Sequence, residues 1–554
     1  MFRTGQDVQI TLNDRMLIAN DQTKKAVATS RAKLVGDIIY PNVEEAKFAD
    51  LYSEIGSRPN IEIRRYVSAL VLKRMYHLSD EVLLEFLRCG ALNFQYALHT
   101  TQEEKQPLSE SSIRRFRRKV EAYNEENGCD LIKDEFERIS KVMAVEMGLL
   151  HADPNSSDDE SAPILVRMDS MEIEAHAKAM TRIEILYMTN MIMIRYLLKK
   201  NFSNIIPEEL FHYLEEGDHN RVMYYRVAEE KKAGVQDCRV AEAVQEMVLL
   251  REALSEYFSQ KFLSDIPEYQ VLQRVLEEQT QLSDDGVLIP RNKKNISAGS
   301  VQNPFDATVT YRYKWGQHHG HVLNVAEVCG NNGNGIIIHA SIEPNIQSDN
   351  RMAEEYLRGL PDGGRKQKLT ADGAYASETV EKLAAEKNVE LQVTSLTGKL
   401  VEDVVADFVL NEGKTEILSC PAGNTPTGCR YNPNNGSITA TMPGNCCASC
   451  PHRDECKAKV NNKKSKSTVR ITGKMVTRAK QARNFTTEEG KKNADFRNGV
   501  EGIMSVMRRK YDLDHIPVFG LDRLKNWIWP TLLSYNLVKY NRYRIALEKK
   551  TSAA

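Results

Sequence analysis

The sequence lacks the long apolar runs that mark membrane and secreted proteins. No run reaches the roughly 18 apolar residues that a membrane-spanning helix needs. The nearest candidate, IEILYMTNMIMIRYLL, is interrupted by Asn190 and Arg195. The opening residues, MFRTGQDVQITLND, contain no apolar stretch of the secretory type. We therefore expect a soluble, cytoplasmic protein that contacts no membrane.

The sequence also lacks the motifs of several common enzyme classes and an excess of either charge. It has no phosphate-binding glycine loop, no dinucleotide-binding fingerprint and no Ser/His/Asp signature, so nucleotide hydrolysis and acyl transfer have no visible basis. The formal net charge of the 554 residues is −1. Overall charge therefore argues neither for nor against a nucleic-acid partner, and any attraction to phosphates must come from local patches.

Cysteine is too scarce for a disulfide scaffold, but its distribution is uneven. The chain has 10 cysteines, and six of them lie between residues 420 and 456. The spacing Cys447-x2-Cys450 is typical of zinc ligands, and in a cytosolic protein it favours a metal over a disulfide. We predict a structural Zn²⁺ held by Cys420, Cys447, Cys450 and Cys456, with Cys446 as the alternative to Cys447. The other interpretation is that several of these residues are ordinary buried thiols.

Hydrophobic periodicity and composition divide the chain into segments of different character. It is α/β in the middle and helical at both ends. The segments that we predict are a polar lead-in at 1–60, a helical DNA-binding domain at 61–150, a catalytic core with strand signals at 164–176 and 300–396, a charged helical insertion at 177–299, a Cys-rich basic insertion at 397–490, and C-terminal helices at 491–554 that complete the core.

Two stretches carry clustered positive charge. In the helical segment, short helices precede SESSIRRFRRKVEAY, which is typical of a helix-turn-helix-like DNA-binding module; the alternative is a solvated helix face. A second basic block follows Cys456 and meets no acidic residue before Glu488, which indicates a phosphate-binding arm. The residues that we expect to bind DNA here are Arg114, Arg115, Arg117 and Arg118 in the first stretch and Lys463, Lys464 and Lys466 in the second.

Three carboxylates stand at positions that suit chemistry better than packing. Asp169 lies inside an apolar strand-like run, Asp372 follows the strand-like QKLTA, and Glu501 lies beside the apolar stripe of a helix over 493–511. Only the fold can bring residues so far apart together, and like charges at one site are costly unless cations compensate them. Carboxylates suit Mg²⁺ or Mn²⁺, and two such ions can promote reactions at a phosphodiester.

These segments together resemble bacterial insertion-sequence transposases of the DDE type. The resemblance rests on VRMDSMEIEAH, NPFDATVTYRYK with GHVLNVAE, TADGAYAS and RNGVEGIMSVMRRKYDL, and extends over roughly residues 60–545. It points to the branch with an N-terminal helical DNA-binding domain and a Cys-containing insertion before the Glu helix. The fold that the resemblance implies is α/β and ribonuclease-H-like, with a mixed five-stranded sheet flanked by helices.

The resemblance also implies roles for individual residues. Asp169, Asp372 and Glu501 would hold two Mg²⁺ or Mn²⁺ ions, Arg497 would orient Glu501 or touch a DNA phosphate, and Lys314 and Arg508 would contact DNA. The chain departs from the family at His321, where Lys or Arg is frequent, and in the turn Gly373-Ala374-Tyr375. Neither departure removes a carboxylate.

The implied function is DNA transposition. The partners would be terminal inverted repeats and target DNA, bound by a homodimer or larger synaptic complex associated with the nucleoid. Two alternatives are a catalytically silent, DNA-binding descendant of a transposase and an endonuclease of the same fold. Terminal-repeat sequence, target preference and the role of the 177–299 insertion cannot be derived from the sequence.

Overall fold

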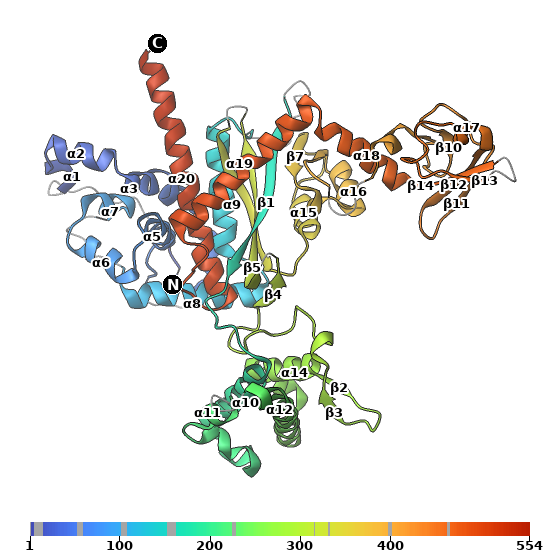
Figure 1. Ribbon diagram of the computed structural model, residues 1–554. Helices are drawn as coiled ribbons and strands as arrows, with labels where there is room; N and C mark the ends of the chain where they lie inside the picture. Colours follow the sequence, from blue (N-terminus) through green and yellow to red (C-terminus); the bar gives the residue numbers. More distant parts are fainter. Residues whose placement is uncertain are drawn as a thin grey trace.

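The computed structural model describes all residues except 1, 5–14, 53–58, 101–107, 152–161, 224–228, 315, 331–332, 397–400, 462–465 and 554. A central sheet is covered by helices, with N-terminal helices on one side, a helical segment below and a small β-rich module beyond α18 and α19 (Figure 1). None of the helices in the described ranges combines the length and apolarity needed to cross a bilayer.

The central sheet is mixed, as the sequence predicts. Strand β1 pairs with β5 antiparallel and with β7 parallel, β7 pairs with β8 parallel, and β5 pairs with β6 and with the short β4, both antiparallel. The five expected strands therefore become six, because the first residues of β5 form a hairpin with β4 before the rest pairs with β6. The strands are β1 (Ile164–Glu174), β4 (Thr310–Tyr313), β5 (Gln317–Cys329), β6 (Gly335–Pro344), β7 (Gln367–Ala371) and β8 (Val389–Val393).

Helices cover both faces of this sheet. Successive side chains of β1 point alternately to one face and to the other, and so pack against different helices. Val166 and Met168 pack with the layer of α15 and α16, whereas Met171 and Ile173 pack with the layer of α9, α19 and α20. Asp169 shares its parity with Met171, so its side chain faces α19. The helices are α9 (Leu131–Glu146), α15 (Asp349–Arg358), α16 (Glu378–Glu386), α19 (Glu488–Tyr511) and α20 (Leu521–Ala553).

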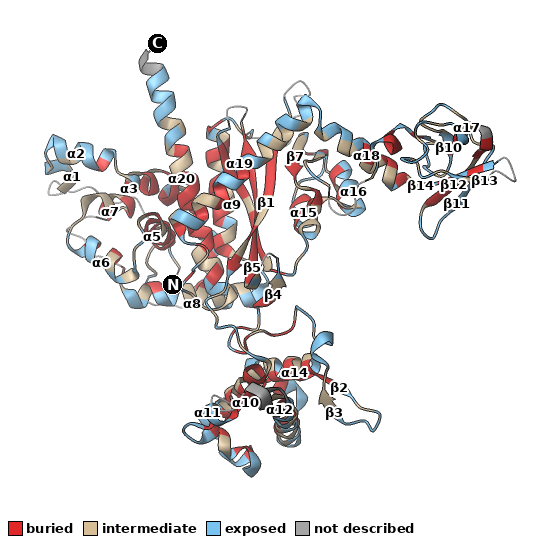
Figure 2. Ribbon diagram, viewed as in Figure 1, coloured by how far each residue is buried: buried red, intermediate tan, exposed pale blue. Residues whose placement is uncertain are grey.

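The N-terminal helices share one hydrophobic core with this layer (Figure 2). Ser534 on α20 donates a hydrogen bond to the carbonyl of Val71 on α5 (3.0 Å). Two of these helices have side-chain caps at their N-termini, since Ser79 accepts from the backbone N–H of Val82 and Ser109 forms a capping box with Ser112. The principal helices here are α3 (Arg31–Leu34), α5 (Ile63–Tyr76), α6 (Asp80–Arg88), α7 (Leu92–Ala97) and α8 (Glu110–Asn127).

Two further segments have cores of their own. The segment between β1 and β4 is helical apart from the hairpin β2 (Thr280–Leu282) and β3 (Leu288–Pro290), and its core lies between α10 (Arg182–Lys199), α12 (Glu229–Tyr257) and α14 (Pro267–Gln279). The Cys-rich segment contains strands that the sequence analysis did not predict. They are β11 (Gly428–Asn432), β12 (Ser437–Pro443), β14 (Lys466–Thr472) and β13 (Lys459–Asn461), joined in that order as an antiparallel sheet.

Candidate active site

The parallel pairing of β1 and β7 brings two of the predicted carboxylates to the same level. Ile164 pairs with Gln367 and Arg167 with Thr370, an offset of 203 residues. Asp169 and Asp372 differ by the same 203 residues, so the continued register places them side by side, one residue beyond the end of β7. Asp169 faces α19, and Asp372 lies near enough for its charge to contribute to the raised pKa of Asp169.

Asp372 begins the turn that follows β7. Its carboxylate accepts a hydrogen bond from the backbone N–H of Ala374 (2.7 Å) and so caps the 3₁₀ turn Gly373–Tyr375. The turn lies so close to the next segment that a Cβ on Gly373 would stand 2.3 Å from the Ser395 carbonyl oxygen. The small residues after Asp372 are therefore required by this close approach.

Asp169 is largely buried and has a single cationic partner. Its carboxylate accepts from the guanidinium of Arg497 (2.6 Å) and from the backbone N–H of Ser170 (2.9 Å). Burial raises the pKa of Asp169 to about 6; Arg497 opposes this rise, and the charges of Asp372 and Asp349 add to it. The rise in pKa is thus chiefly an effect of burial, which Arg497 offsets only in part.

Glu501 lies across a hollow from Asp169. It is exposed on α19, with 65% of its side chain accessible, and accepts from the other guanidinium nitrogen of Arg497 (3.0 Å). Arg497 therefore bridges Asp169 and Glu501. The hollow measures about 420 Å³, and its lining consists of Asp169, Ser170, Met171, Glu501, Met504, Ser505, Arg508 and Arg509.

A fourth acidic residue near these carboxylates was missed by the sequence analysis. Asp349, at the start of α15, accepts from the hydroxyl of Ser170 (2.9 Å) on the other face of β1. Its charge contributes to the raised pKa of Asp169. The sequence signal is an acidic residue in the first helical turn after the strand GIIIHASIEP, where helix N-termini favour carboxylates in any protein. Because acidic residues are common at helix N-termini, Asp349 did not stand out in the sequence.

The carboxylates are brought together without forming a closed metal-binding shell. Across the described ranges, no group of three or more His, Cys, Asp or Glu side chains is arranged to hold a metal ion. Asp169 and Asp372 fit a hard divalent cation by their chemistry and by their register. The guanidinium of Arg497 lies between Asp169 and Glu501 and donates to both.

The predicted DNA-binding arginines of α8 have different surroundings. Arg117 forms two 2.8 Å hydrogen bonds with Asp80 and ties α8 to α6, and Arg114 pairs with Glu110 (2.6 Å) on its own helix. The lining of a hollow of about 330 Å³ includes Lys73, Arg74, Arg114, Arg117, Arg118 and Arg523. The basic character predicted for α8 thus extends to α5 and α20.

The remaining predicted DNA contacts are dispersed. Lys314 is exposed after β4, Lys466 is exposed at the start of β14, and Arg508 lines the hollow and pairs with Asp514 (3.3 Å). Arg115 lies close enough to Tyr66 to influence its titration. Lys463 and Lys464 lie outside the described residues.

The clustered cysteines line one small cavity in the β-rich module. The cavity measures about 20 Å³, and Cys420, Cys446, Cys447, Cys450 and Cys456 are among its lining residues. None of these five cysteines forms a disulfide bond. Burial raises the pKa of Cys456 to about 11, with neighbouring Cys450, Cys420 and Cys447 adding to the rise. Cys429, in contrast, is exposed on β11.

Two family models match separate parts of the chain. One, described as "Transposase DDE domain", matches residues 419–541, which include the clustered cysteines and Glu501 but neither Asp169 nor Asp372. The other, described as "Transposase domain (DUF772)", matches residues 22–119, which include most of α8. No curated protein and no solved structure matches the chain. The two matched segments support the resemblance that the sequence motifs indicate.

Proposed function

We propose that this chain binds terminal inverted repeats and cuts and joins DNA with two divalent metal ions. Its two transposase family matches indicate an insertion-sequence transposase of the DDE type. One observation carries the chemistry. The β1–β7 register brings Asp169 and Asp372 to neighbouring positions, and Asp169 shares a hollow with Glu501 of α19. Residues brought together from three distant parts of the chain are hard to explain by packing alone.

The strand order supports a ribonuclease-H-like core. Without the short β4, the order is β6-β5-β1-β7-β8, with β5 antiparallel to both of its long neighbours and β1, β7 and β8 parallel. In this arrangement the first acid is in the central strand and the second follows the adjacent parallel strand. Glu501 then comes from a later helix that lies over both strands.

Asp169, Asp372 and Glu501 are the residues that would hold Mg²⁺ or Mn²⁺. Such ions, when bound, activate a water or hydroxyl and stabilise the leaving oxygen of a phosphodiester. The chain's own contribution is to orient the acids. Asp372 is fixed by its bond to Ala374 N–H and Asp169 by Ser170 N–H, while Arg497 donates to both Asp169 and Glu501. Arg497 also provides a guanidinium that suits a phosphate oxygen.

DNA binding is assigned to several basic surfaces. Arg114 and Arg118 on α8 line the hollow shared with α5 and α20, and Arg115, exposed on the same helix, would add a further contact. Arg117 contributes chiefly by fixing α8 to Asp80. Lys314, Arg508 and Lys466, with Lys463 and Lys464, would contact DNA closer to the catalytic core or on the β-rich module. Because strand transfer requires two DNA ends held together, we propose a dimer or larger synaptic assembly.

We also propose that the cysteine cavity is a structural zinc site. Cys420, Cys447, Cys450 and Cys456 supply the four thiolates that Zn²⁺ prefers. Their shared cavity makes the convergence possible. These four residues would hold the Zn²⁺, which when bound would cross-link the segments of the β-rich module that carry them.

A strand-transfer assay tests the proposed function. A plasmid that carries the coding sequence with its flanking DNA is incubated with the purified protein, Mg²⁺ and a second plasmid. Joining of the flanked segment to the second plasmid supports a transposase. Cleavage without joining would identify the endonuclease alternative, and binding without either reaction would identify the silent DNA-binding descendant.

A further inference from the structure

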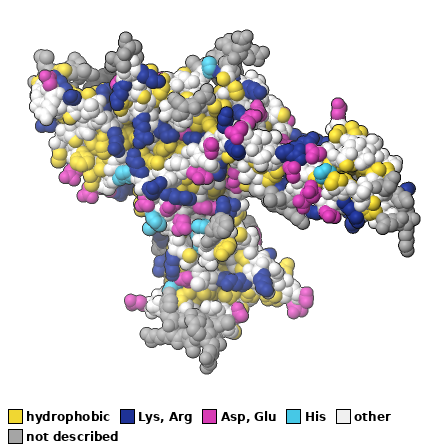
Figure 3. Space-filling view, turned by 45° about the horizontal axis from the view of Figure 1, so that its top comes forward, with side chains coloured by type: hydrophobic (Ala, Val, Ile, Leu, Met, Phe, Trp, Pro, Cys, Tyr) yellow, Lys and Arg dark blue, Asp and Glu magenta, His cyan; other side chains and the backbone are white. Residues whose placement is uncertain are grey.

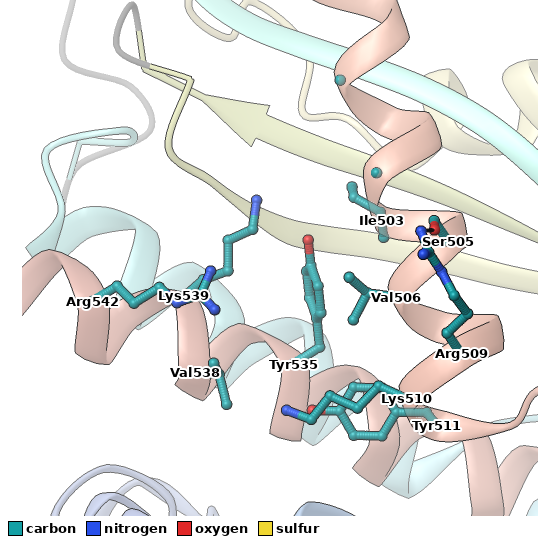
Figure 4. Close-up of a pocket in the computed structure, with 12 residues that line it drawn as sticks. Ile503, Ser505, Val506, Arg509, Lys510, Tyr511, Tyr535, Val538, Lys539 and Arg542 are labelled. Carbon is teal, nitrogen blue, oxygen red and sulfur yellow. Dashed lines mark hydrogen bonds between the residues drawn. The ribbon is translucent and has the colours of Figure 1, made fainter.

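A second hollow lies on the other side of α19 from the carboxylates. It is a groove of about 590 Å³ between α19 and α20, and Figure 4 shows basic side chains around it from both helices, with Tyr535 between them. The cations in its lining are Arg509, Lys510, Lys539 and Arg542, and the lining contains no acidic residue. The groove differs in this respect from the hollow beside β1, whose lining includes the acidic residues Asp169 and Glu501.

Most of these cations have no acidic partner. In the described part of the chain, neither Lys510 nor Arg542 forms an ion pair, and Arg509 donates to the hydroxyl of Ser505. Lys539 is the exception, because it pairs with buried Glu327 (3.2 Å) at the base of the groove. Burial lowers the pKa of Lys510, and the nearby charges of Arg31 and Arg542 lower it further. Cations that repel one another at a concave surface form a site that an anion would stabilise.

The groove is continuous with the candidate active site. Ser505 and Arg509 line both hollows, one and two helical turns beyond Glu501. The eight residues from Glu501 to Arg509 rise about 12 Å along the helix. A nucleic-acid strand advances about 3.4 Å per phosphate in a duplex, so this rise corresponds to roughly three or four phosphates. A strand whose scissile phosphate lies beside Glu501 can therefore place its next phosphates over Arg509.

Two glycines keep this wall of the groove close to the sheet and free of side chains. A Cβ on Gly499 would stand 1.7 Å from a guanidinium nitrogen of Arg167, which donates to the carbonyl of Phe496 (2.9 Å) and pairs with Glu327 (2.6 Å). A Cβ on Gly502 would meet nothing within 4 Å. Gly499 thus allows α19 to approach β1, whereas at Gly502 the helix backbone is open to a ligand.

We propose that this groove binds the phosphodiester backbone of the DNA strand that crosses α19 from the catalytic hollow. The proposal rests on the proposed function, because it assumes that the substrate at Asp169 and Glu501 is DNA. Figure 3 shows Lys and Arg side chains gathered on the central body of the molecule, where an approaching duplex would meet them. Lys510 and Arg542 are the principal contacts, and Arg31 borders them from α3.

The test is the salt dependence of DNA binding by the full-length protein. Fluorescence anisotropy with a labelled 20-base-pair duplex is measured between about 50 and 200 mM salt for wild type and for the double variant Lys510→Ala/Arg542→Ala. Loss of two phosphate contacts should reduce the slope of log K against log salt by about 1.8 and weaken binding by about 10- to 60-fold at 100 mM salt. The matched control, Lys293→Ala/Lys294→Ala, removes the same charge from exposed residues of the helical insertion and should leave the slope unchanged.

The charge-preserving variant Lys510→Arg/Arg542→Lys separates charge from folding, and it should bind within about twofold of wild type. If the wild type and the alanine variant have equal slopes and the wild type cleaves DNA, then the proposal that the groove binds DNA is wrong. The catalytic proposal is then unaffected. If the alanine variant shows the predicted reduction in slope but the wild type never cleaves DNA, the groove is supported and the catalytic proposal is overturned. A wild type that does not bind DNA would overturn both.

Discussion

Two sites in this molecule contain groups that repel one another when they are ionised, and the two sites differ in how this repulsion is avoided. Carboxylates meet at the end of β1 and β7, and thiols meet in the cavity of the β-rich module. The carboxylates receive a cation from the chain itself, because Arg497 bridges Asp169 and Glu501. Among the thiols, burial instead raises the pKa of Cys447 and raises the pKa of Cys456 to about 11, so these two favour the neutral form.

The difference follows from the intrinsic acidity of the two groups. A carboxyl group is ionised at pH 7 unless its pKa rises by several units, so a cluster of them needs positive charge at all times. A thiol is mostly protonated at pH 7, so a cluster of thiols tolerates proximity without help. We therefore expect the carboxylate hollow to keep its shape without a metal, and the thiol cavity to depend on a metal for its final structure.

Removal of zinc should have the largest effect. Cys450→Ser should lower the zinc content from one ion per chain to almost none and destabilise the β-rich module by several kcal/mol, because structural zinc contributes about 10–16 kcal/mol in small zinc domains. Elemental analysis gives the metal content, and limited proteolysis with thermal denaturation measures the stability of the β-rich module. Cys238→Ser, at an exposed thiol in the helical insertion, is the control. Wild-type protein that contains no zinc and is indifferent to a chelator would contradict the prediction.

Loss of a carboxylate should have the opposite signature, with a large loss of activity and little loss of structure. Asp372→Asn should reduce DNA cleavage in Mg²⁺ by about a thousandfold or more, because metal-assisted catalysis contributes several kcal/mol. DNA binding, measured by gel shift, should not change. Asp362→Asn, at an exposed residue that pairs with Lys387, should cleave normally. If the Asp372 variant still cleaves, the assignment of the active site is wrong.

The contrast between these sites also indicates what the sequence could reveal. Asp169 and Asp372 stood out because they lie within or directly after apolar strand-like runs, and Glu501 because it lies beside the apolar stripe of a helix; patterns of period 2 and 3.6 locate strands and helices. The mixed sheet flanked by helices was implied by the resemblance to DDE transposases, whereas the patterns alone indicated only where strands and helices alternate. Their convergence depends on the 203-residue register of β1 with β7, which no local pattern encodes.

The strands of the β-rich module remained hidden for a different reason. Their alternation is short and polar, as in GCRYN of β11, whose residues are all exposed. The role of Arg497 as a bridge was also not derivable from periodicity. Its spacing from Glu501 on α19 was visible, but its 2.6 Å bond to Asp169 joins residues 328 positions apart. Long-range pairing of this kind is set by the tertiary fold.

A smaller effect should appear in the stability of the metal-free protein. The pKa of Asp169 is raised to about 6 in the folded chain, so the native state binds more protons than the unfolded state between about pH 4 and 6. Stability should therefore fall as the pH rises through this range, by about 1–3 kcal/mol. Asp169→Asn should remove this dependence and increase the free energy of unfolding at pH 7 in EDTA, as measured by urea denaturation.

Repeating the urea denaturation with Mg²⁺ tests whether Asp169 binds the metal, and it needs no activity assay. Saturating Mg²⁺ should stabilise the wild type by mass action and stabilise the Asp169→Asn variant less, since the variant has lost a ligand. An Asn variant that is no more stable than the wild type at pH 7 without metal would show that Arg497 already compensates the charge in full.

The smallest effect concerns that arginine. If Arg497 takes the place of a cation between Asp169 and Glu501, then Arg497→Gln should tighten Mg²⁺ binding by roughly fivefold, because two unit charges about 4 Å apart in water interact by about 1 kcal/mol. A thermal-shift titration with Mg²⁺ gives the midpoint independently of cleavage. Arg542→Gln, which removes a cation from the groove beyond α19, should leave the midpoint unchanged. Weaker binding in the Arg497 variant would instead mean that the guanidinium holds the acids in place for the metal, and the parallel between arginine and metal would fail.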